Sequence, residues 1–358
     1  MRARPRIAAL PRRLPSNPYC ALLYGAVERL GVEVVEGASG VRWLLRARRR
    51  VAVLHFHWPE RHFDPRRLAS AVAFVLRLLL ARLLGYRLVW TVHNLRPHEG
   101  DTPGHRLVRA ALLRLATPIA HCEAARRALG RAAARAVVVP HGSYVGWYPN
   151  RVGARAARAR LGLAADARVL ACFGQIRPYK GIEQLLRAFA AIPDPDVRLV
   201  IAGEPVGGAD ARVLAVGDPR VQLVLGRIPD DEVQVVVNAA DVMVVPYRDV
   251  LTSGAAMLAF SFGRGIIAPR LGCLADLAET GAAILYDPDE PGALAAALRR
   301  GLAADATALG GAARRLARAL SWEAIARRHL AVYGLAPTLA LVSGRDGAPA
   351  ARSALRKG

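Results

Sequence analysis

The sequence predicts an α/β protein built from two facing doubly wound domains with a cleft between them. The chain has 358 residues, more than one hydrophobic core normally serves, so two domains are the default. Hydrophobic residues make up 53% of the chain, which excludes disorder over most of its length. Short β-rich runs alternate with Ala/Leu/Arg helical patterns, and this alternation is typical of parallel sheets with crossover helices.

Two series of strands follow from this alternation, and they meet near residue 150. The first series is predicted at Arg6–Leu10, Val32–Glu36, Val51–His57, Arg87–His93, Pro118–Cys122 and Ala136–Pro140, with helices such as Tyr19–Leu30 and Pro65–Leu84 between them. The second is predicted at Arg168–Gly174, Val197–Gly203, Val221–Leu225, Val242–Pro246, Gly265–Ala268 and Ala283–Tyr286. We therefore expect Rossmann-like domains at 1–150 and 151–320, a final helix at 321–335 and a disordered tail at 336–358.

The charge of the chain is strongly basic and unevenly distributed. There are 51 Lys and Arg against 28 Asp and Glu, a net charge of +23, and residues 1–150 alone hold 25 basic and 8 acidic residues. Only Lys180 and Lys357 are lysines, so compositional bias explains part of the charge and the retained Lys180 becomes informative. The arginines lie among alanines without an aromatic stacking platform, which argues against a nucleic-acid-binding protein.

An anionic membrane surface is the partner that this basic half would fit. The arginines that we expect to face it are Arg4, Arg6, Arg12, Arg13 and the cluster Arg46, Arg48, Arg49 and Arg50. The longest apolar stretch, Leu68 to Leu84, contains two arginines and makes a poor membrane span. No signal-peptide pattern follows residues 1–13. We therefore expect a cytoplasmic protein, peripheral on the inner face of the plasma membrane.

The four cysteines are far apart in the sequence. They are Cys20, Cys122, Cys172 and Cys273. Without metal-ligand spacing, they predict buried free thiols in a reducing cytoplasm rather than a zinc site or a disulfide framework. The acidic pair Asp194 and Asp196 precedes a predicted strand and reads as a turn, so we predict no metal.

Ligands of doubly wound sheets bind beyond the carboxyl ends of the strands, so polar residues there are the candidates. Residues 173–181 follow one strand and open a helix, and Arg177 and Lys180 there would bind a diphosphate beside the amides near Gly174. Ser253 would cap the next helix and leave amides at Gly254 for phosphate, although capping alone also explains it. Further strand-end residues of this half are Glu204 and the pair Arg227 and Ile228, which would contact a nucleobase.

In the first half, the candidate residues are mostly histidines. His93 and Asn94 stand at a strand end before a polar loop that contains Glu99, a candidate general base. The non-functional alternatives are a structural core histidine at 93 and a solvent-exposed glutamate at 99. His55 and His57 alternate on one strand and face the same side. The remaining candidates for binding a second substrate are Asn17, Tyr19 and His141.

These motifs together resemble the GT-B glycosyltransferases, the large nucleotide-sugar-dependent group that includes glycosyltransferase family four. The resemblance covers residues 7–334, and its most specific pieces are FGQIRPYKG at 173–181, LVIAGEP at 199–205, AADVMVVPYRDVLTSG at 239–254 and the FG(x)₄AP run at 262–269. SNPY at 16–19, TVHNLRPHE at 91–99 and VVPHGSY at 138–144 are similar to bacterial members that extend lipid-linked oligosaccharides, mannosyltransferases among them.

The resemblance implies a donor nucleotide bound by the second domain, an acceptor bound by the first, and no metal. Arg177 and Lys180 match the family's diphosphate pair, and Ser253 and Gly254 match its phosphate- and sugar-binding loop. Arg227 and Ile228 match the base contact, and His93 matches a histidine that faces the donor sugar. Many members carry two glutamates around the second loop; here those positions hold no carboxylate, and Asp249 is the nearest acid.

The resemblance therefore implies a metal-independent hexosyltransferase without a cofactor. It would move a hexose, with mannose as the candidate, from a GDP- or UDP-sugar to a hydroxyl of a glycan or glycolipid. Glu99 or His93 is the candidate base if the reaction inverts the anomeric centre, and no enzymic base is needed if it retains it. The alternatives are a nucleotide-sugar epimerase of the same fold and a basic nucleic-acid-binding protein, against which the missing aromatic platform argues.

Overall fold

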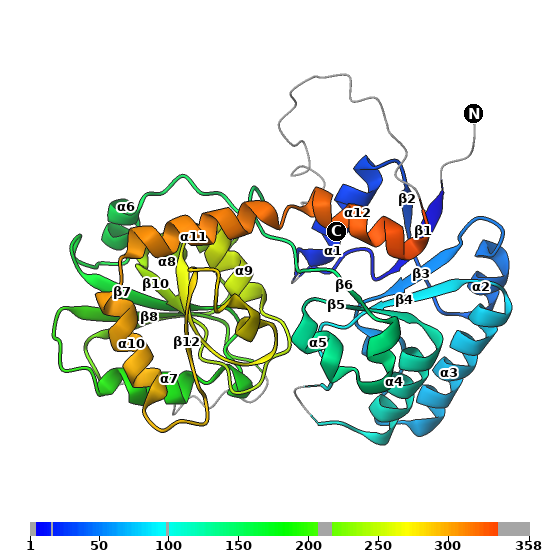
Figure 1. Cartoon of the computed structure of the whole chain (residues 1–358), viewed down its shortest axis with the longest axis horizontal. Helices are drawn as coiled ribbons and strands as arrows, with labels where there is room; N and C mark the ends of the chain where they lie inside the picture. The colour runs from blue at the N-terminus through cyan, green and yellow to red at the C-terminus, as the bar shows by residue number, and fades with distance from the viewer. Residues whose placement is uncertain (1–4, 16, 98–99, 207–216, 336–358) are drawn as a thin grey trace, which may run out of the picture.

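Two six-stranded parallel sheets form the framework of the protein (Figure 1). The structure is a computed structural model, and it describes residues 5–15, 17–97, 100–206 and 217–335. We call the first sheet with its helices the first lobe and the second sheet with its helices the second lobe. The predicted α/β class of two doubly wound units is confirmed, and each strand lies within two residues of its predicted ends. The predicted disordered tail at 336–358 lies outside the described residues.

The first lobe has the strand order β2-β1-β3-β4-β5-β6. Its strands are β1 (Arg6–Leu10), β2 (Glu33–Glu36), β3 (Val53–Phe56), β4 (Arg87–Thr91), β5 (Thr117–Ala120) and β6 (Val137–Val138). Its helices are α1 (Tyr19–Arg29), α2 (Val41–Ala47), α3 (Leu68–Leu83), α4 (Pro103–Leu115) and α5 (Glu123–Ala128), with 3₁₀ turns η1 (Pro59–His62) and η2 (Gly130–Arg135). The strand order reverses direction between β1 and β3, and loops that leave such a switch point form a crevice.

The second lobe has the strand order β12-β11-β10-β7-β8-β9. Its strands are β7 (Arg168–Phe173), β8 (Val197–Gly203), β9 (Val221–Leu225), β10 (Val242–Val244), β11 (Gly265–Pro269) and β12 (Ala283–Tyr286). Its helices are α6 (Ala154–Arg160), α7 (Ile182–Ala190), α8 (Val233–Ala239), α9 (Gly254–Ser261), α10 (Ala293–Ala303) and α11 (Ala306–Ala319), with 3₁₀ turns η3 (Pro178–Lys180) and η4 (Gly272–Leu277). Here the switch point lies between β7 and β10, the strands that precede the two predicted phosphate segments.

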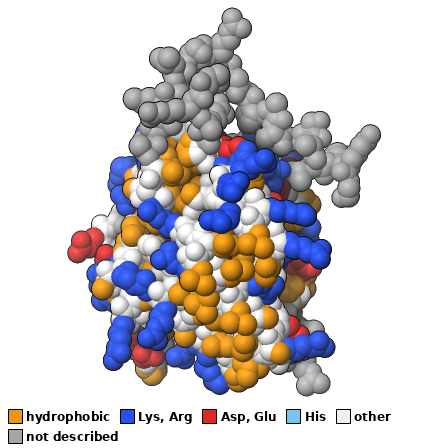
Figure 2. All heavy atoms as spheres, turned by 90° about the vertical axis from the view of Figure 1, so that its right-hand side faces the viewer, with side chains coloured by type: hydrophobic (Ala, Val, Ile, Leu, Met, Phe, Trp, Pro, Cys, Tyr) orange, Lys and Arg blue, Asp and Glu red, His pale blue; other side chains and the backbone are white. Residues whose placement is uncertain are grey.

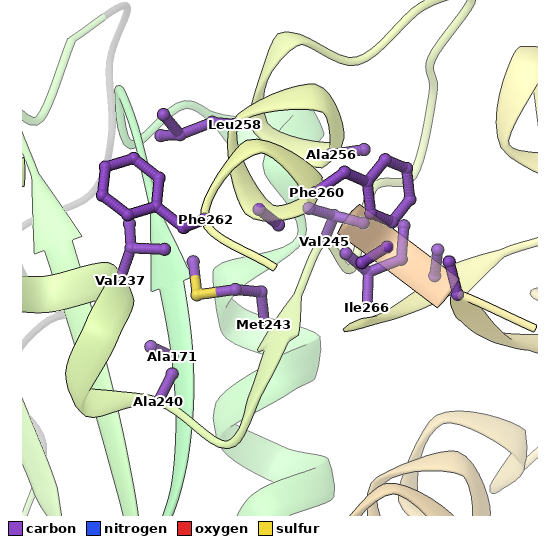
Figure 3. Packing of buried hydrophobic residues seen from close by; sticks show 14 of the residues in the cluster. Ala171, Val237, Ala240, Met243, Val245, Ala256, Leu258, Phe260, Phe262 and Ile266 are labelled. Atoms are coloured by element: carbon purple, nitrogen blue, oxygen red, sulfur yellow. The ribbon is translucent and has the colours of Figure 1, made fainter. Parts of the chain in front are cut away.

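The core of the second lobe fixes the helix that follows β10. Met243 and Val245 at β10 lie in one cluster with Phe260 and Phe262 at the end of α9, and Ile266 of β11 packs beside them (Figure 3). All five side chains are buried. Since α9 is apolar and packed in this way, its first residues are held at a defined place beyond the sheet edge.

The last helix, α12 (Trp322–Tyr333), belongs to the first lobe. The chain leaves α11 in the second lobe and crosses back (Figure 1). Trp322, Leu330 and Tyr333 of α12 are buried in one cluster with Tyr19 and Tyr24 of α1. The first lobe is therefore completed by residues that follow the whole second lobe in the sequence.

The expectation of four free thiols is wrong for two of the cysteines. Cys122, at the start of α5, is bonded to Cys273 in η4, so a disulfide joins the two lobes across a separation of 151 residues. Cys20 and Cys172 are free and buried, as expected. The sequence could not show the pair because the two thiols meet only when the lobes are docked.

No helix of the described residues combines the length and the apolar character needed to cross a membrane. This agrees with the sequence, in which arginines interrupt the longest apolar stretch.

Candidate active site

The two segments predicted to share a diphosphate meet at one hydroxyl group. Lys180 Nζ donates a hydrogen bond to the Tyr247 hydroxyl at 2.9 Å, and Ser253 Oγ donates to the same oxygen at 3.3 Å. Lys180 follows β7 and Ser253 follows β10, which are neighbours in the sheet. Tyr247 was not singled out from the sequence, although it lies inside the motif at 239–254.

Glycine at position 181 makes this approach sterically allowed. Gly181 has φ +70°, and a Cβ there would overlap the carbonyl oxygen of Pro246. The backbone N–H of Arg248 donates to Tyr179 O at 2.8 Å, and Gln184 Nε2 donates to Pro246 O. These contacts attach the loop after β7 to the loop after β10, so the position of Lys180 follows from the backbone as well as from its own hydrogen bond.

A second close approach shapes the edge beside Lys180. Gly203 has φ +148°, and a Cβ there would overlap the carbonyl oxygen of Gly174. A Cβ at Gly174 would in turn stand 3.7 Å from Lys180 Nζ, so the bare Gly174 borders that ammonium group. Pairing between the two chains continues beyond the strands, because Ile176 N donates to Glu204 O at 2.8 Å.

The N-terminus of α9 lies at the same place. Ser253 is its N-cap and accepts a hydrogen bond from Ala256 N at 3.1 Å. A Cβ at Gly254 would stand 3.1 Å from the Tyr144 hydroxyl, so Tyr144 covers this first turn. A helix N-terminus offers backbone N–H groups and partial positive charge, which stabilise an anion.

The other candidate donor-binding residues lie on loops of the same sheet edge. Arg177 is half-buried, and its Nε donates to Gln175 Oε1 at 3.3 Å. Arg227 and Glu204 are exposed and follow β9 and β8, while Ile228 packs against the core of the second lobe. Asp249 is exposed two residues after Tyr247. Their roles toward a ligand stay predictions.

Lys180 is charged at neutral pH in this environment. Burial alone would lower the pKa of its ammonium group, but the interactions with Tyr247 and Tyr179 outweigh burial and hold the pKa above its ordinary value. The half-buried Lys180 therefore supplies a fixed positive charge at the end of β7.

His93 connects the first lobe to this arrangement. Its carbonyl oxygen accepts a hydrogen bond from Thr252 Oγ1 of the second lobe at 3.3 Å. Its ring Nε2 lies 3.1 Å from His57 Nδ1, and the ring stacks on Trp58 with centroids 4.5 Å apart. The backbone of the predicted donor-facing histidine thus contacts Thr252, the residue directly before Ser253.

Six of the nine histidines, His93 among them, form one cluster in the first lobe. His57, His93, His121 and His141 surround the ring of Tyr19, with centroid distances of 4.7–5.6 Å. The other two members of the group are His55 and His329. No set of three or more His, Cys, Asp or Glu within the described ranges could hold a metal ion.

Three of the candidate acceptor-side residues are buried in the lobe. Tyr19 and His55 are fully buried, and His57 is 1% exposed, although it lines the small pocket described below. His55 is hydrogen bonded to Thr91 at 2.8 Å and to Tyr333 of α12 at 2.8 Å. The burial has a simple reason: α12 covers this part of the sheet, and the sequence does not show where that helix packs.

Burial keeps the histidine cluster neutral. It lowers the pKa of His55, His57 and His93 well below the ordinary value, with neighbouring histidines adding to the effect. The pKa of His121 falls to about 4 and that of His141 to about 3, again mainly through burial. A neutral imidazole is the form that accepts a proton from a hydroxyl group.

A small pocket of about 70 Å³ opens beside the cluster. Its lining includes His57, Trp58, Glu60, Asn94, Arg96 and Arg109. Of these, only His57 and Asn94 were predicted as acceptor-side residues, and Asn17 and His141 do not line the pocket. Glu60 was missed, although it lies in the turn η1 shortly after β3. The residue is exposed overall, but desolvation by the surrounding protein raises the pKa of its carboxyl group. Glu99 lies outside the described residues.

A larger hollow of about 550 Å³ lies elsewhere in the second lobe, between β12 and α10. Its lining includes Arg270, Tyr286, Glu290 and Arg300, and none of the predicted site residues. Lys180 and Ser253 line neither hollow, but the smaller pocket adjoins the histidine cluster through His57. The backbone of His93 in that cluster contacts Thr252, next to Ser253. We therefore take the second-lobe edge that carries Lys180 and Ser253, together with the histidine cluster and its pocket, as the candidate active site.

Comparisons with known proteins agree with this assignment. Residues 167–304 match the family model described as glycosyl transferases group 1. A GDP-mannose:glycolipid 4-beta-D-mannosyltransferase from Xanthomonas campestris pv. campestris is 32% identical over 295 residues, 78% of each chain. A D-inositol 3-phosphate glycosyltransferase from Kineococcus radiotolerans is 32% identical over 282 residues, 68% of this chain and 63% of the relative.

Solved structures show the same fold at lower identity. Sucrose-phosphate synthase from Thermosynechococcus elongatus has a TM-score of 0.71 and 22% identity, over 92% of this chain and 98% of the other. Anabaena HepE in complex with UDP-glucose has a TM-score of 0.71 and 17% identity, over 93% of this chain and 100% of the other.

Proposed function

This chain belongs to the group 1 glycosyltransferases, and from that premise we propose that it transfers mannose from GDP-mannose to a hydroxyl group of a glycolipid. Membership rests on the mannosyltransferase relative, of which the chain covers 78%. It confirms the predicted GT-B family and hexosyltransferase activity. The relatives support glycosyl transfer and give no support to the epimerase alternative.

One observation carries the proposed donor site: Lys180 and Ser253 share the Tyr247 hydroxyl at the switch point of the second sheet. We place the diphosphate of the donor there, between the Lys180 ammonium group, Arg177 and the backbone amides at the start of α9 near Gly254. Negative charge grows on the diphosphate as the sugar leaves, and fixed positive groups stabilise it most in the transition state. These groups supply the charge that a metal would otherwise supply, which supports the prediction of a metal-independent reaction.

The relative's name supports an inverting reaction. It describes a β-mannosyl product, whereas the sugar in GDP-mannose is α-linked. We propose that the acceptor hydroxyl oxygen attacks the anomeric carbon while the bond to the diphosphate breaks and GDP leaves. The hydroxyl proton passes to the neutral imidazole of His93. NMR of the product would test this, because an α-linked mannose would contradict inversion.

The pocket provides a second candidate base. Glu60 lines the space next to His57 and Trp58, and its carboxyl pKa is raised. His93→Ala and Glu60→Gln would separate the two candidates. We expect the base variant to lose activity and the acid limb of the pH–rate profile, and the other variant to keep that limb.

A thermal-shift panel tests the donor without knowledge of the acceptor. We expect GDP and GDP-mannose to raise the melting temperature of the wild type more than UDP and UDP-glucose do, because only a bound ligand stabilises the fold. Lys180→Ala should reduce the shift measurably, and the matched control Arg299→Ala, an exposed cation of α10, should keep it in full. Equal shifts for all four nucleotides, or an unaltered shift in Lys180→Ala, would contradict the proposed site.

A lipid-linked acceptor also fits a cytoplasmic enzyme that works at a membrane surface. Such an enzyme needs a face that rests on the membrane while its acceptor pocket stays open.

A further inference from the structure

The first lobe carries an exposed apolar stripe on its outer helices. Most of the large hydrophobic side chains that are exposed in the described part of the chain lie on α2 and α3: Val41, Leu45, Leu68, Val72, Leu76, Leu79 and Leu83. On α3 they recur at intervals of three or four residues and therefore form one continuous face. Leu83 is 86% exposed and Leu76 is 59% exposed, so none of the residues that the structure describes covers this face.

The stripe is not the core-facing side of α3. That side carries Ala71, Phe74, Leu78 and Ala81, which are buried against the first sheet. A surface helix normally has one apolar face, whereas α3 has two on opposite sides. The outer one is about 24 Å long for a 16-residue helix.

The surroundings of the stripe are predominantly basic, with Asp64, paired to Arg67 before α3, as an acid close to it. Residues 37–59 contain five arginines and residues 65–98 contain six, and neither segment contains an Asp or a Glu. The α2 cluster Arg46, Arg48, Arg49 and Arg50 is exposed and makes no ion pair within the described ranges. Figure 2, which looks at this side, shows hydrophobic side chains in the centre with Lys and Arg on both flanks.

We propose that the α2–α3 face docks on an anionic lipid surface, with α3 lying in the plane of the interface. An interfacial helix combines an apolar face with flanking cations that contact anionic headgroups. The charge argues against a second copy of the chain as the occupant, because two such faces would bring many arginines together with few acids to compensate them. For its biological purpose, the inference rests on the proposed glycolipid acceptor.

The structure changes the surface expected from the sequence. Arg6 is paired with Glu33 at 2.6 Å and Arg12 with Glu28 at 2.5 Å, so these two arginines are partly neutralised. Arg4 lies outside the described residues. The arginines of α2 stay in the proposal, and the leucines of α3 are new to it.

The docking face and the pocket are joined through α3. Phe63 lines the pocket and stacks on Phe74 of α3, with ring centroids 5.6 Å apart. The inner side of the helix thus supports the pocket wall, and its outer side is free for lipid.

Vesicle co-sedimentation of the full chain, without donor or acceptor, tests the inference. We expect binding to phosphatidylcholine vesicles with about 30 mol% phosphatidylglycerol and little binding to pure phosphatidylcholine. Arg46→Gln with Arg49→Gln should weaken binding about 25-fold, at about fivefold for each cation. Leu76→Gln with Leu79→Gln should weaken it at least about tenfold.

Matched controls come from the second lobe. Leu225→Gln removes a leucine of similar exposure from β9, and Arg299→Gln with Arg318→Gln removes two exposed arginines. These variants should bind like the wild type. Equal binding to both kinds of vesicle, equal losses in the controls, or a wild-type dimer that the α3 substitutions split would overturn the inference. Vesicle binding without mannosyl transfer would instead contradict the proposed function and leave this surface in place.

Discussion

Replacing Tyr247 by Phe tests the arrangement on which the donor site depends. The substitution removes one oxygen atom, which receives hydrogen bonds from both Lys180 and Ser253, and keeps the buried ring. A hydrogen bond to a charged group contributes about 1.5–3 kcal/mol, and 1.4 kcal/mol corresponds to a tenfold change in rate. If most of that energy positions Lys180 against the leaving diphosphate, kcat should fall about 10- to 100-fold.

The effect should fall on kcat more than on the KM for GDP-mannose. Charge on the diphosphate increases toward the transition state, so a misplaced ammonium group weakens that state more than it weakens donor binding. Initial rates of GDP release at varied GDP-mannose concentrations would separate the two constants. Lys180→Ala, measured in parallel, should lose about 10²–10³ in rate.

Tyr286→Phe is the matched control. Tyr286 ends β12 in the same lobe, is buried, and has a hydroxyl without a hydrogen-bond partner in the described part of the structure. Its removal should leave kcat within about twofold of the wild type, because no hydrogen bond is lost. If Tyr247→Phe behaves like this control while Lys180→Ala is inactive, the shared hydroxyl does not position the lysine and our reasoning is refuted.

Three further predictions concern the loop, the histidines and the disulfide. Gly181→Ala should reduce kcat at least about tenfold, because the added methyl group would overlap the carbonyl oxygen of Pro246. Gly292 has a similar φ of +77° but open space around it, so Gly292→Ala should not reduce kcat in this way. An equal loss of kcat in both variants would refute the steric argument. His121 and His329 have pKa values lowered to about 4, so the unfolded chain binds protons first, and stability is lost as pH falls from about 6.5 to 4. Each histidine should lower the free energy of unfolding by about 3 kcal/mol over this pH range, which would appear as a falling melting temperature. A melting temperature that does not change between these pH values would contradict the prediction. Reduction of Cys122–Cys273 should lower the free energy of unfolding by about 2–4 kcal/mol, and non-reducing peptide mapping should find the linked peptides; free thiols at both positions would contradict the bond.

Local sequence patterns were sufficient for the strands and for the donor loops. Runs such as Val197–Gly203 are β-branched and short, and Gly follows or ends them, so their bounds could be predicted closely. Lys180 and Ser253 could be brought together in advance because each follows a strand at a switch point, and parallel strands end at one edge. The convergence of these two side chains at one sheet edge could therefore be predicted from their positions after neighbouring strands.

Features that depend on docking of distant parts could not be predicted. Tyr19 and His55 seemed available to a ligand because nothing local shows that α12 covers them. The Tyr247 hydroxyl is one of several polar groups in its motif, and only the turn at Gly181 brings Lys180 to it. Glu60 was passed over because a single acid after a strand carries no distinctive spacing.

The return of α12 to the first lobe means that the first sheet and the helix that completes its core are separated in the sequence by the whole second lobe. During synthesis, the strands of the first lobe leave the ribosome well before Trp322, Leu330 and Tyr333 do. Until then, Tyr24 and His55 lack the side chains that bury them, and His55 lacks one hydrogen-bond partner. A nascent chain stopped before residue 322 would therefore expose apolar surface of the first lobe to chaperones and proteases, so a truncation that spares both sheets would still destabilise the first lobe.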